Sequence, residues 1–284
     1  MISLISSYHM NLKIGVGLVA YNNNKVDLIN LSKSLDNCNL TYRVVIDNSP
    51  SEDLKDLFEE NNWIYISNKK NPGFGASHNI IIREYSSKVK YHVVINPDIY
   101  FDYDVTSILA KFMEKTPDCG NVMPKILYPN NDNQRLAKLL PSPSGWFLRR
   151  FAKNTNILKK YNYNFELKKF DENSVFKSPY LSGCFMFLRV EALNKVGMFD
   201  DEIFMYGEDT DLTRRLWISG NYPYYYGKTA VFHQFAKGSH TSTKLLKIAI
   251  KSTIYYFNKW GWIDRQRIKI NTNCLNQFQI NSQK

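Results

Sequence analysis

The sequence predicts an α/β fold in which a mostly parallel central sheet is flanked by helices. Short apolar runs alternate with stretches of helical periodicity through the first half of the chain, and this alternation is typical of β-α-β units. Polar side chains follow several of the apolar runs. Because ligands bind outside the carboxyl ends of parallel strands, the same pattern predicts where a site lies.

The first half contains five expected strands and four expected helices. The strands are expected at 13–20, 42–46, 63–66, 91–95 and from 121 onward, and the helices at 24–36, 51–60, 75–87 and 104–115. Ser51 is a good N-cap residue, and acidic side chains follow it in the first turn. A chain of 284 residues is long enough to bury a full core around such a sheet.

The second half is less regular. Residues 129–178 are polar and contain Pro141 and Pro143, so we expect a long, partly mobile excursion over the site. Further elements are expected as an apolar run at 183–190, helices at 191–196, 208–219 and 243–260, and strands at 222–226 and 229–232. We expect one domain over 1–240 and a C-terminal amphipathic, basic helical extension over 241–284.

The formal net charge of +11 is concentrated in two segments. Residues 145–170 contain seven Lys and Arg against one Glu, and 244–284 contain eight against one Asp. A basic surface attracts anionic lipid, nucleic acid or a diphosphate substrate. The helix 243–260 runs into Trp260-Gly261-Trp262, which suits a helix lying in a membrane interface. Docking of this helix on the rest of the protein, and a merely solvated lysine-rich surface, are the alternatives.

Several observations bear on location. The four cysteines are scattered, without a C-x-x-C pair, which argues against a zinc site or disulfide framework and fits a reducing cytosol. The first 13 residues lack a basic region followed by a long apolar core, so no signal peptide is expected. No run of 18 apolar residues occurs, so no membrane span is expected.

Three carboxylates gather in Glu208-Asp209-Thr210-Asp211, at the start of an expected helix. A helix N-terminus favours negative charge, and one carboxylate held there beside a cleft can act as a general base. The alternative is plain helix capping with an ion pair to Arg215.

Four further groups lie at or near expected strand ends. Asp98, in Asn96-Pro97-Asp98, can bind Mg²⁺ or Mn²⁺ with diphosphate oxygens, or simply form a turn. Asp47 can accept a hydrogen bond from a base N–H, or form an Asx turn or helix cap. His233 can ligate the metal, although a structural role is the more common one for such a histidine. The glycines of Asn71-Pro72-Gly73-Phe74-Gly75 allow backbone to approach a phosphate at a helix start.

Taken together and in order, these stretches resemble the family 2 glycosyltransferases, which have the Rossmann-like GT-A fold. Within that family they most resemble the bacterial rhamnosyltransferase-like branch that builds O-antigen and capsule. The resemblance covers about 13–240. The matching residues are Val19-Ala20-Tyr21-Asn22, Asp47-Asn48-Ser49, Asn71 to Gly75, Asn96-Pro97-Asp98, Ser182-Gly183-Cys184-Phe185, Gly197 to Glu202, Glu208 to Leu212, Arg215 and His233.

The resemblance implies an inverting transferase that uses a nucleotide-diphospho-sugar, with dTDP-rhamnose as the first expectation and UDP-hexoses or UDP-N-acetylhexosamines as alternatives. It implies Asp209 as the catalytic base, with Glu208 orienting the acceptor. The implied metal ligands for Mg²⁺ or Mn²⁺ are Asp98 and His233; Asn96 stands where many members have the first Asp of an Asp-x-Asp motif. The implied donor site consists of Ala20, Tyr21, Asn22, Asp47, Asn48, Asn71, Gly73, Phe74, Gly75, Asn79 and Asn96. The implied acceptor site consists of Ser182, Gly183, Glu208 and Arg215.

The implied acceptor is a glycan on a polyprenyl diphosphate, which the protein meets at the cytoplasmic face of the bacterial plasma membrane. The two basic segments would then bind the anionic membrane surface; nucleic acid is not an expected partner, and oligomers are possible. Two other functions compete. A nucleotidyltransferase usually needs a glycine-rich basic loop after the first strand, and Ala20 to Lys25 contains no glycine. A non-enzymatic, basic lipid- or nucleic-acid-binding protein leaves the ordered strand-end motifs unexplained.

Overall fold

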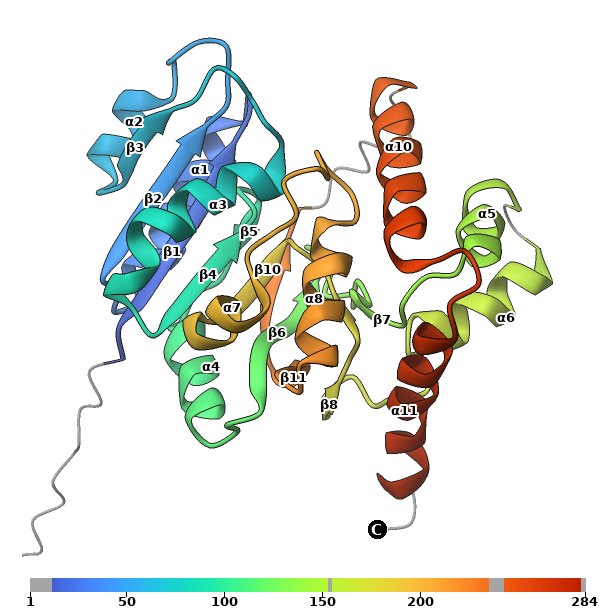
Figure 1. Ribbon diagram of the computed structural model, residues 1–284. Coiled ribbons are helices and arrows are strands. Elements are labelled where there is room, and N and C mark those ends of the chain that lie inside the picture. The colour runs from blue at the N-terminus through green and yellow to red at the C-terminus, as the bar shows by residue number, and fades with distance from the viewer. Residues whose placement is uncertain (1–11, 153–154, 235–242, 282–284) are drawn as a thin grey trace, which may run out of the picture.

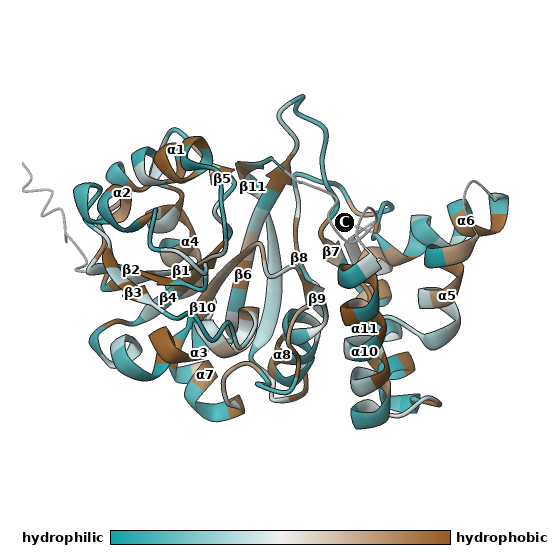
Figure 2. Cartoon of the chain, turned by 90° about the horizontal axis from the view of Figure 1, so that it is seen from above, coloured by the Kyte–Doolittle hydropathy of each residue, from teal (hydrophilic) through white to brown (hydrophobic). Residues whose placement is uncertain are grey.

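A mixed, mostly parallel sheet forms the centre of the molecule in the computed structural model, which describes residues 12–152, 155–234 and 243–281 (Figure 1). The strand order is β3-β2-β1-β4-β10-β6-β11-β5, and β8 pairs with β11 beside this path. Helices cover both faces of the sheet (Figure 2). The predicted fold class is therefore confirmed.

The first half follows the predicted alternation closely. Its parallel strands are β1 (Ile14–Ala20), β2 (Tyr42–Asp47), β3 (Ile64–Ser67) and β4 (Tyr91–Ile95). Between and after them lie α1 (Lys25–Asp36), α2 (Lys55–Glu60), α3 (Phe74–Tyr85), the 3₁₀ turn η1 (Ser86–Lys88), β5 (Ile99–Tyr100) and α4 (Val105–Glu114). The prediction that Ser51 is the N-cap of this helix is wrong. The Ser51 hydroxyl donates to Asp53, and α2 begins one turn later without a side-chain cap.

The second half inserts an antiparallel strand into the middle of the sheet, between two strands that are parallel to each other. β10 (Phe185–Arg189) runs antiparallel to both β4 and β6 (Cys119–Leu127), and it is followed by α7 (Val190–Val196) and α8 (Glu208–Ile218). The two strands predicted between 222 and 232 form the single strand β11 (Tyr222–His233). The pairing register of β11 with β6 shifts between Tyr226 and Ala230. A local bulge within one strand, rather than a loop between two strands, therefore separates the two predicted stretches.

The core lies on both faces of the sheet. Helices α1 and α4 pack on one face, with residues such as Leu28 and Leu109 buried against β1 and β4. Helices α3, α7 and α8 pack on the other face, where Ile82, Leu193 and Leu212 meet Val94 of β4 and Leu188 of β10 (Figure 2). Because both faces are covered, β1, β4 and β10 are buried along almost their whole length.

The segment 129–178 contains its own short elements: β7 (Ala137–Lys138), α5 (Pro143–Phe151), α6 (Asn156–Phe165) and β8 (Val175–Lys177). β7 pairs antiparallel with β9 (Tyr180–Leu181) to form a separate two-stranded sheet. Figure 1 places β7, α5 and α6 on the side of the molecule remote from β1 and β2. Mobility of this segment stays a prediction.

The C-terminal extension consists of α10 (Thr243–Trp260) and α11 (Arg265–Asn281). It is docked on the protein, because Tyr256 and Phe257 of α10 and Ile270 and Cys274 of α11 are buried. No described helix is both long enough and apolar enough to span a bilayer. The domain boundary that we expected at residue 240 falls within 235–242, which lie outside the described residues. Residues 1–11, which bear on the expected absence of a signal peptide, also lie outside them.

Candidate active site

The N-terminus of α8 presents Asp209 to the interior of the protein. Tyr206 and Gly207 precede the helix with φ values of +71° and +126°, a backbone conformation that favours glycine at the second position. One carboxylate oxygen of Asp209, Oδ2, accepts hydrogen bonds from Gly183 N at 2.9 Å and from the Tyr180 hydroxyl at 3.3 Å. The other, Oδ1, accepts from Thr210 N at 2.6 Å. The carboxylate is therefore fixed in position.

Glu208 is the second acidic group of this site, and its environment differs from that of Asp209. It is buried, and its Oε2 atom has no hydrogen-bond partner among the described residues. Burial, and then the negative charge of Asp209, raise the pKa of Glu208 to about 8. Burial also raises the pKa of Asp209, but the donors around that carboxylate oppose this effect. The donors around Asp209 thus favour the charged form of that carboxylate, whereas burial favours the protonated form of Glu208 at neutral pH.

A cavity of about 580 Å³ opens in front of the two carboxyl groups. Its volume lies in the range of ligand-binding clefts. Four parts of the chain line it: the strand ends, the segment 129–178, the start of α8 and one face of α10. The lining includes Asn96, Ser182, Gly183 and His233; Lys138, Trp146, Arg149, Arg150 and Tyr161; Tyr180, Tyr206, Glu208 and Asp209; and Leu246, Ala249, Thr253, Tyr256 and Phe257.

Asp98 and His233 meet at the edge of this cavity, as the carboxyl-end argument predicts. His233 Nε2 lies 3.2 Å from Asp98 Oδ1. His233 Nδ1 lies 2.9 Å from Gln134 Oε1, and this contact orients the imidazole ring.

This pair fits a divalent cation, because a carboxylate oxygen and an imidazole nitrogen converge with the imidazole oriented by a further hydrogen bond. In the described part of the chain no cluster of three or more His, Cys, Asp or Glu side chains surrounds it. The protein would thus supply few ligands and leave positions for oxygen atoms of a bound molecule, which is how Mg²⁺ and Mn²⁺ commonly bind phosphates.

The residues predicted for the donor base lie together at the ends of β1 and β2. The Asp47 carboxylate is buried and accepts one hydrogen bond on each oxygen, from Ser49 N and from the Tyr65 hydroxyl, both at 2.9 Å. Asn22 N donates to Ser49 Oγ at 2.8 Å. Ala20 is buried and its carbonyl accepts from Asn48 N. Tyr21 is 51% exposed, so its ring is open to a ligand.

The predicted phosphate loop serves a packing role that the sequence did not reveal. A Cβ atom at Gly73, where φ is +106°, would lie 2.2 Å from the carbonyl oxygen of Phe204, and Phe74 N donates to that oxygen. The Asn79 side chain both donates to and accepts from the backbone of Phe199. Asn71, with φ of +42°, precedes this turn. These contacts tie the start of α3 to the loop that leads into Glu208. Approach of a phosphate stays a prediction.

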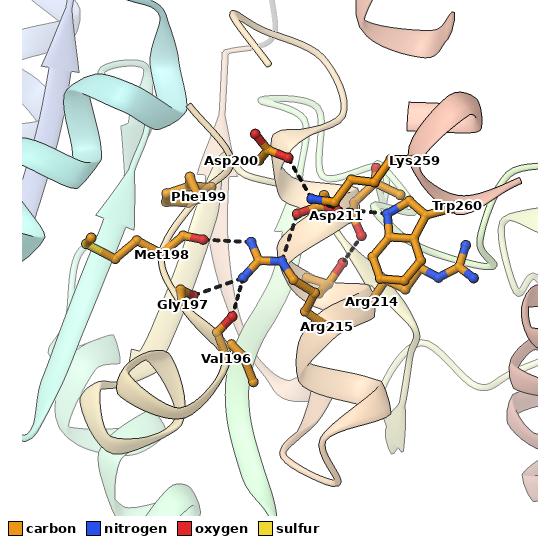
Figure 3. Close-up of polar contacts among 12 residues, drawn as sticks. Val196, Gly197, Met198, Phe199, Asp200, Asp211, Arg214, Arg215, Lys259 and Trp260 are labelled. Atoms are coloured by element: carbon orange, nitrogen blue, oxygen red, sulfur yellow. Dashed lines mark hydrogen bonds and ion pairs between the residues drawn. The ribbon is translucent and has the colours of Figure 1, made fainter. Parts of the chain in front are cut away.

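The residues predicted for the acceptor divide into two groups. Ser182 and Gly183 line the cavity, and the Gly183 amide holds Asp209. Arg215 is not among the lining residues. Its guanidinium binds Asp211 at 2.8 Å and donates to the carbonyls of Val196, Gly197 and Met198 (Figure 3).

Asp211 is the centre of a buried network that joins α8 to α10 (Figure 3). Its carboxylate is fully buried and accepts from Arg215 Nε, Lys259 Nζ and Trp260 Nε1, each at 2.8 Å. Lys259 also binds Asp200 at 2.6 Å. The C-terminal extension therefore helps to hold the helix that carries Asp209.

Sequence reasoning missed much of the cavity wall. Lys138 lies directly opposite Tyr180 in the β7–β9 pair, and no local motif marks either residue. Arg149 and Arg150 belong to the basic cluster that we had assigned only to a surface. The signal that could have found the α10 wall is the apolar spacing of Leu246, Ala249, Thr253 and Phe257.

The family model described as "Glycosyl transferase family 2" matches residues 16–197 of this chain. The chain is 26% identical over 260 residues to a protein of Escherichia coli (strain K12) named rhamnosyltransferase WbbL. The aligned region covers 86% of this chain and 91% of that protein.

Solved structures with a similar fold share 13–14% sequence identity with the chain. GalNAc-T7 with UDP, GalNAc and Mn²⁺ has a TM-score of 0.62 over 88% of this chain, which spans 49% of that structure. The mannosyltransferase PcManGT from Pyrobaculum calidifontis, in complex with GDP-Man and Mn²⁺, has a TM-score of 0.58 over 87% of this chain and 63% of that chain. S. aureus TarS 1-349 in complex with UDP has a TM-score of 0.54 over 94% of this chain and 71% of that chain.

Proposed function

The chain belongs to glycosyl transferase family 2 and is a glycosyltransferase, and we propose that it transfers L-rhamnose from dTDP-rhamnose, with inversion, to a hydroxyl of a lipid-linked oligosaccharide. The similarity to a rhamnosyltransferase along most of both chains supports rhamnose as the sugar. One observation carries the proposal of an inverting transfer: the Asp209 carboxylate, fixed by hydrogen bonds to both of its oxygens, faces a cavity that the strand-end residues Asn96 and His233 also line.

In this proposal Asp209 is the general base. The acceptor hydroxyl attacks the anomeric carbon, its proton passes to Asp209, and the bond from that carbon to the diphosphate oxygen breaks. The nucleoside diphosphate leaves from the opposite face of the sugar. An inverting transfer needs one such base and no second carboxylate nucleophile, which matches a pair in which one member is protonated. Protonated Glu208 would donate a hydrogen bond that orients the acceptor.

The donor would lie across the ends of β1, β2 and β4. Asp47 would accept from an N–H of the pyrimidine base, and each of its oxygens already has one donor that fixes its direction. Asp98 and His233 would hold a divalent cation, which when bound offsets the charge of the leaving diphosphate. The packing of Gly73 against Phe204 would keep the start of α3 close to that group.

We further propose that the protein works at the cytoplasmic face of the plasma membrane on an acceptor carried by a polyprenyl diphosphate. Lys244, Lys247 and Lys251 of α10, with the exposed Trp262 and Ile263 at its end, support contact with an anionic lipid surface. Sedimentation with vesicles of anionic and of neutral lipid tests this. We expect co-sedimentation with the anionic vesicles alone; equal recovery with both, or with neither, would contradict it.

The donor is tested by calorimetric titration of the protein with dTDP-rhamnose and a panel of UDP-sugars, with and without Mn²⁺. We expect dTDP-rhamnose to bind most tightly and Mn²⁺ to strengthen its binding. Preferential binding of a UDP-hexose or UDP-N-acetylhexosamine would replace rhamnose as the sugar and leave the reaction type standing. Absence of binding by every donor would overturn the proposed function.

A further inference from the structure

Two cationic side chains that line the catalytic cavity, Lys138 and Arg149, are incompletely paired. Within the described residues neither a hydrogen bond nor an ion pair engages the Lys138 ammonium. Arg149 reaches Glu166 at 3.6 Å and stacks over Phe165 at 4.6 Å, but its buried Nε has no partner among these residues. Such groups are costly to leave unsatisfied, so they point to a ligand.

The position of Lys138 relative to the catalytic base is set by strand pairing. Lys138 of β7 lies directly opposite Tyr180 of β9, and the Tyr180 hydroxyl donates to Asp209. Side chains directly opposite each other in an antiparallel pair point to the same face. The ammonium therefore lies in the same cavity as the base, one side chain away from it.

The charge of the cavity is unbalanced toward the positive. The three cationic side chains Lys138, Arg149 and Arg150 line it against the two carboxyl groups of Glu208 and Asp209, and burial raises the pKa of Glu208 to about 8. Burial and the nearby charge of Arg149 lower the pKa of Lys138 to about 8. An anion bound between the two cations would reverse this effect, because it favours their charged forms.

We propose that Lys138 and Arg149 form an anion subsite that holds the diphosphate at the reducing end of the acceptor. This inference rests on the proposed function. An arginine fork beside a lysine point charge suits phosphate oxygens, and two cations match a diphosphate. The apolar wall of Leu246, Ala249 and Phe257 on α10 lines the same cavity and suits the first isoprene units.

The subsite serves the acceptor rather than the donor because of where it lies. Strands β1 and β2 are on the opposite side of the molecule from β7 and α5 in both views (Figures 1 and 2), and Asp47 is the last residue of β2. Helix α8, whose first turn carries Asp209, lies between these two sides, as a helix that carries the base of a transfer between two substrates must.

Binding of geranyl diphosphate to the full chain, measured by calorimetry, tests the subsite. We expect Lys138→Met and Arg149→Gln each to weaken binding roughly tenfold and the double variant more, since each removes a hydrogen bond to a charged group. Lys138→Arg, which keeps the charge, should retain most of the affinity. Lys160→Met is the matched control, because Lys160 is an exposed lysine of the neighbouring helix α6. Thermal unfolding of each variant identifies those that fail to fold.

Titrations with inorganic pyrophosphate and with dTDP separate the sources of the anion. If pyrophosphate binds more weakly than geranyl diphosphate, but still depends on Lys138, the subsite is supported. The difference in affinity between the two ligands is then due to contact of the geranyl chain with the α10 wall. Loss of dTDP affinity in the double variant, in parallel with geranyl diphosphate, would assign the cations to the donor and overturn the proposal. So would unchanged binding of geranyl diphosphate in the double variant, or none in the wild type.

The failure of this inference is distinguishable from failure of the proposed function. A protein that binds dTDP-rhamnose and transfers its sugar, but shows no Lys138-dependent binding of geranyl diphosphate, lacks the subsite and keeps the function. A protein that binds geranyl diphosphate through Lys138 and Arg149, but binds no nucleotide-sugar, has the subsite and lacks the proposed function.

Discussion

Trp260 of α10 donates its indole N–H to the fully buried carboxylate of Asp211 in α8, with 2.8 Å between the nitrogen and Oδ1. The two residues lie 49 positions apart in sequence. Asp211 is two residues beyond the proposed base Asp209, so this bond links the C-terminal extension directly to the helix that carries Asp209. The extension is thus part of the support of the candidate site.

Replacing Trp260 by Phe should lower the free energy of unfolding by about 1–2 kcal/mol, because Asp211 loses a donor that cannot be replaced by water. We expect a smaller loss from Trp262→Phe. That side chain is 48% exposed and donates to Asn258 on the surface. Urea denaturation of the two variants makes the comparison, and equal losses would contradict a special role for Trp260.

Replacing Asp211 by Asn should destabilise the protein more strongly, by about 3–5 kcal/mol, since Arg215 and Lys259 would each lose a buried partner. The matched control is Asp36→Asn, which breaks a pair with Arg43 in which the Asp36 side chain is 60% exposed. We expect about 1 kcal/mol or less from that change. If the two variants unfold at the same denaturant concentration, the network of Figure 3 does not hold α8 in place.

Glu208 gives the unfolding free energy a predictable pH dependence. Its pKa is raised from the model-compound value of 4.5 to about 8 in the folded protein. Between these values the folded state binds more protons than the unfolded state, so stability falls as pH rises. Glu208→Gln removes this contribution. We expect the variant to gain stability over the wild type progressively from pH 5 to pH 8, as measured by denaturation at each pH. A constant difference would show that Glu208 is not shifted.

Asp98→Asn and His233→Ala test the metal site. In the presence of Mn²⁺ each variant should bind dTDP-rhamnose more weakly than the wild type, because each removes one proposed ligand of the cation. With a chelator present, the three proteins should bind the donor with similar affinity. Calorimetry under both conditions decides this; variants that are equally impaired with the chelator would assign the two residues a structural role instead.

The sequence could predict which polar residues gather at the strand ends because these elements are local. Asp47, Asn96 and Asp98 each follow an apolar run, and parallel strands bring their carboxyl ends to one edge. The opposite wall of the cavity depends on pairings between distant segments. Lys138 reaches the cavity only through the two-residue strand β7, and Tyr180 only through β9. Periodicity within a short window cannot specify such a pairing.

The antiparallel strand β10 and the docked face of α10 were unpredictable for a related reason. An apolar strand buried on both faces has the same composition in either direction, so 183–190 carried no signal of its orientation. The apolar stripe of α10 fitted a membrane interface and a protein surface equally well. The burial of Tyr256 and Phe257 inside the protein shows that this face of α10 packs on the protein.

The central claim is that Asp209 is the base of an inverting transfer, and one comparison tests it most directly. Sugar transfer and donor binding are measured in parallel for the wild type, Asp209→Asn and Asp56→Asn, the last being an exposed aspartate of α2. The account predicts that Asp209→Asn loses transfer by about 10²–10⁴-fold and keeps the donor affinity of the wild type, while Asp56→Asn keeps both. Transfer by Asp209→Asn at the wild-type rate would contradict it.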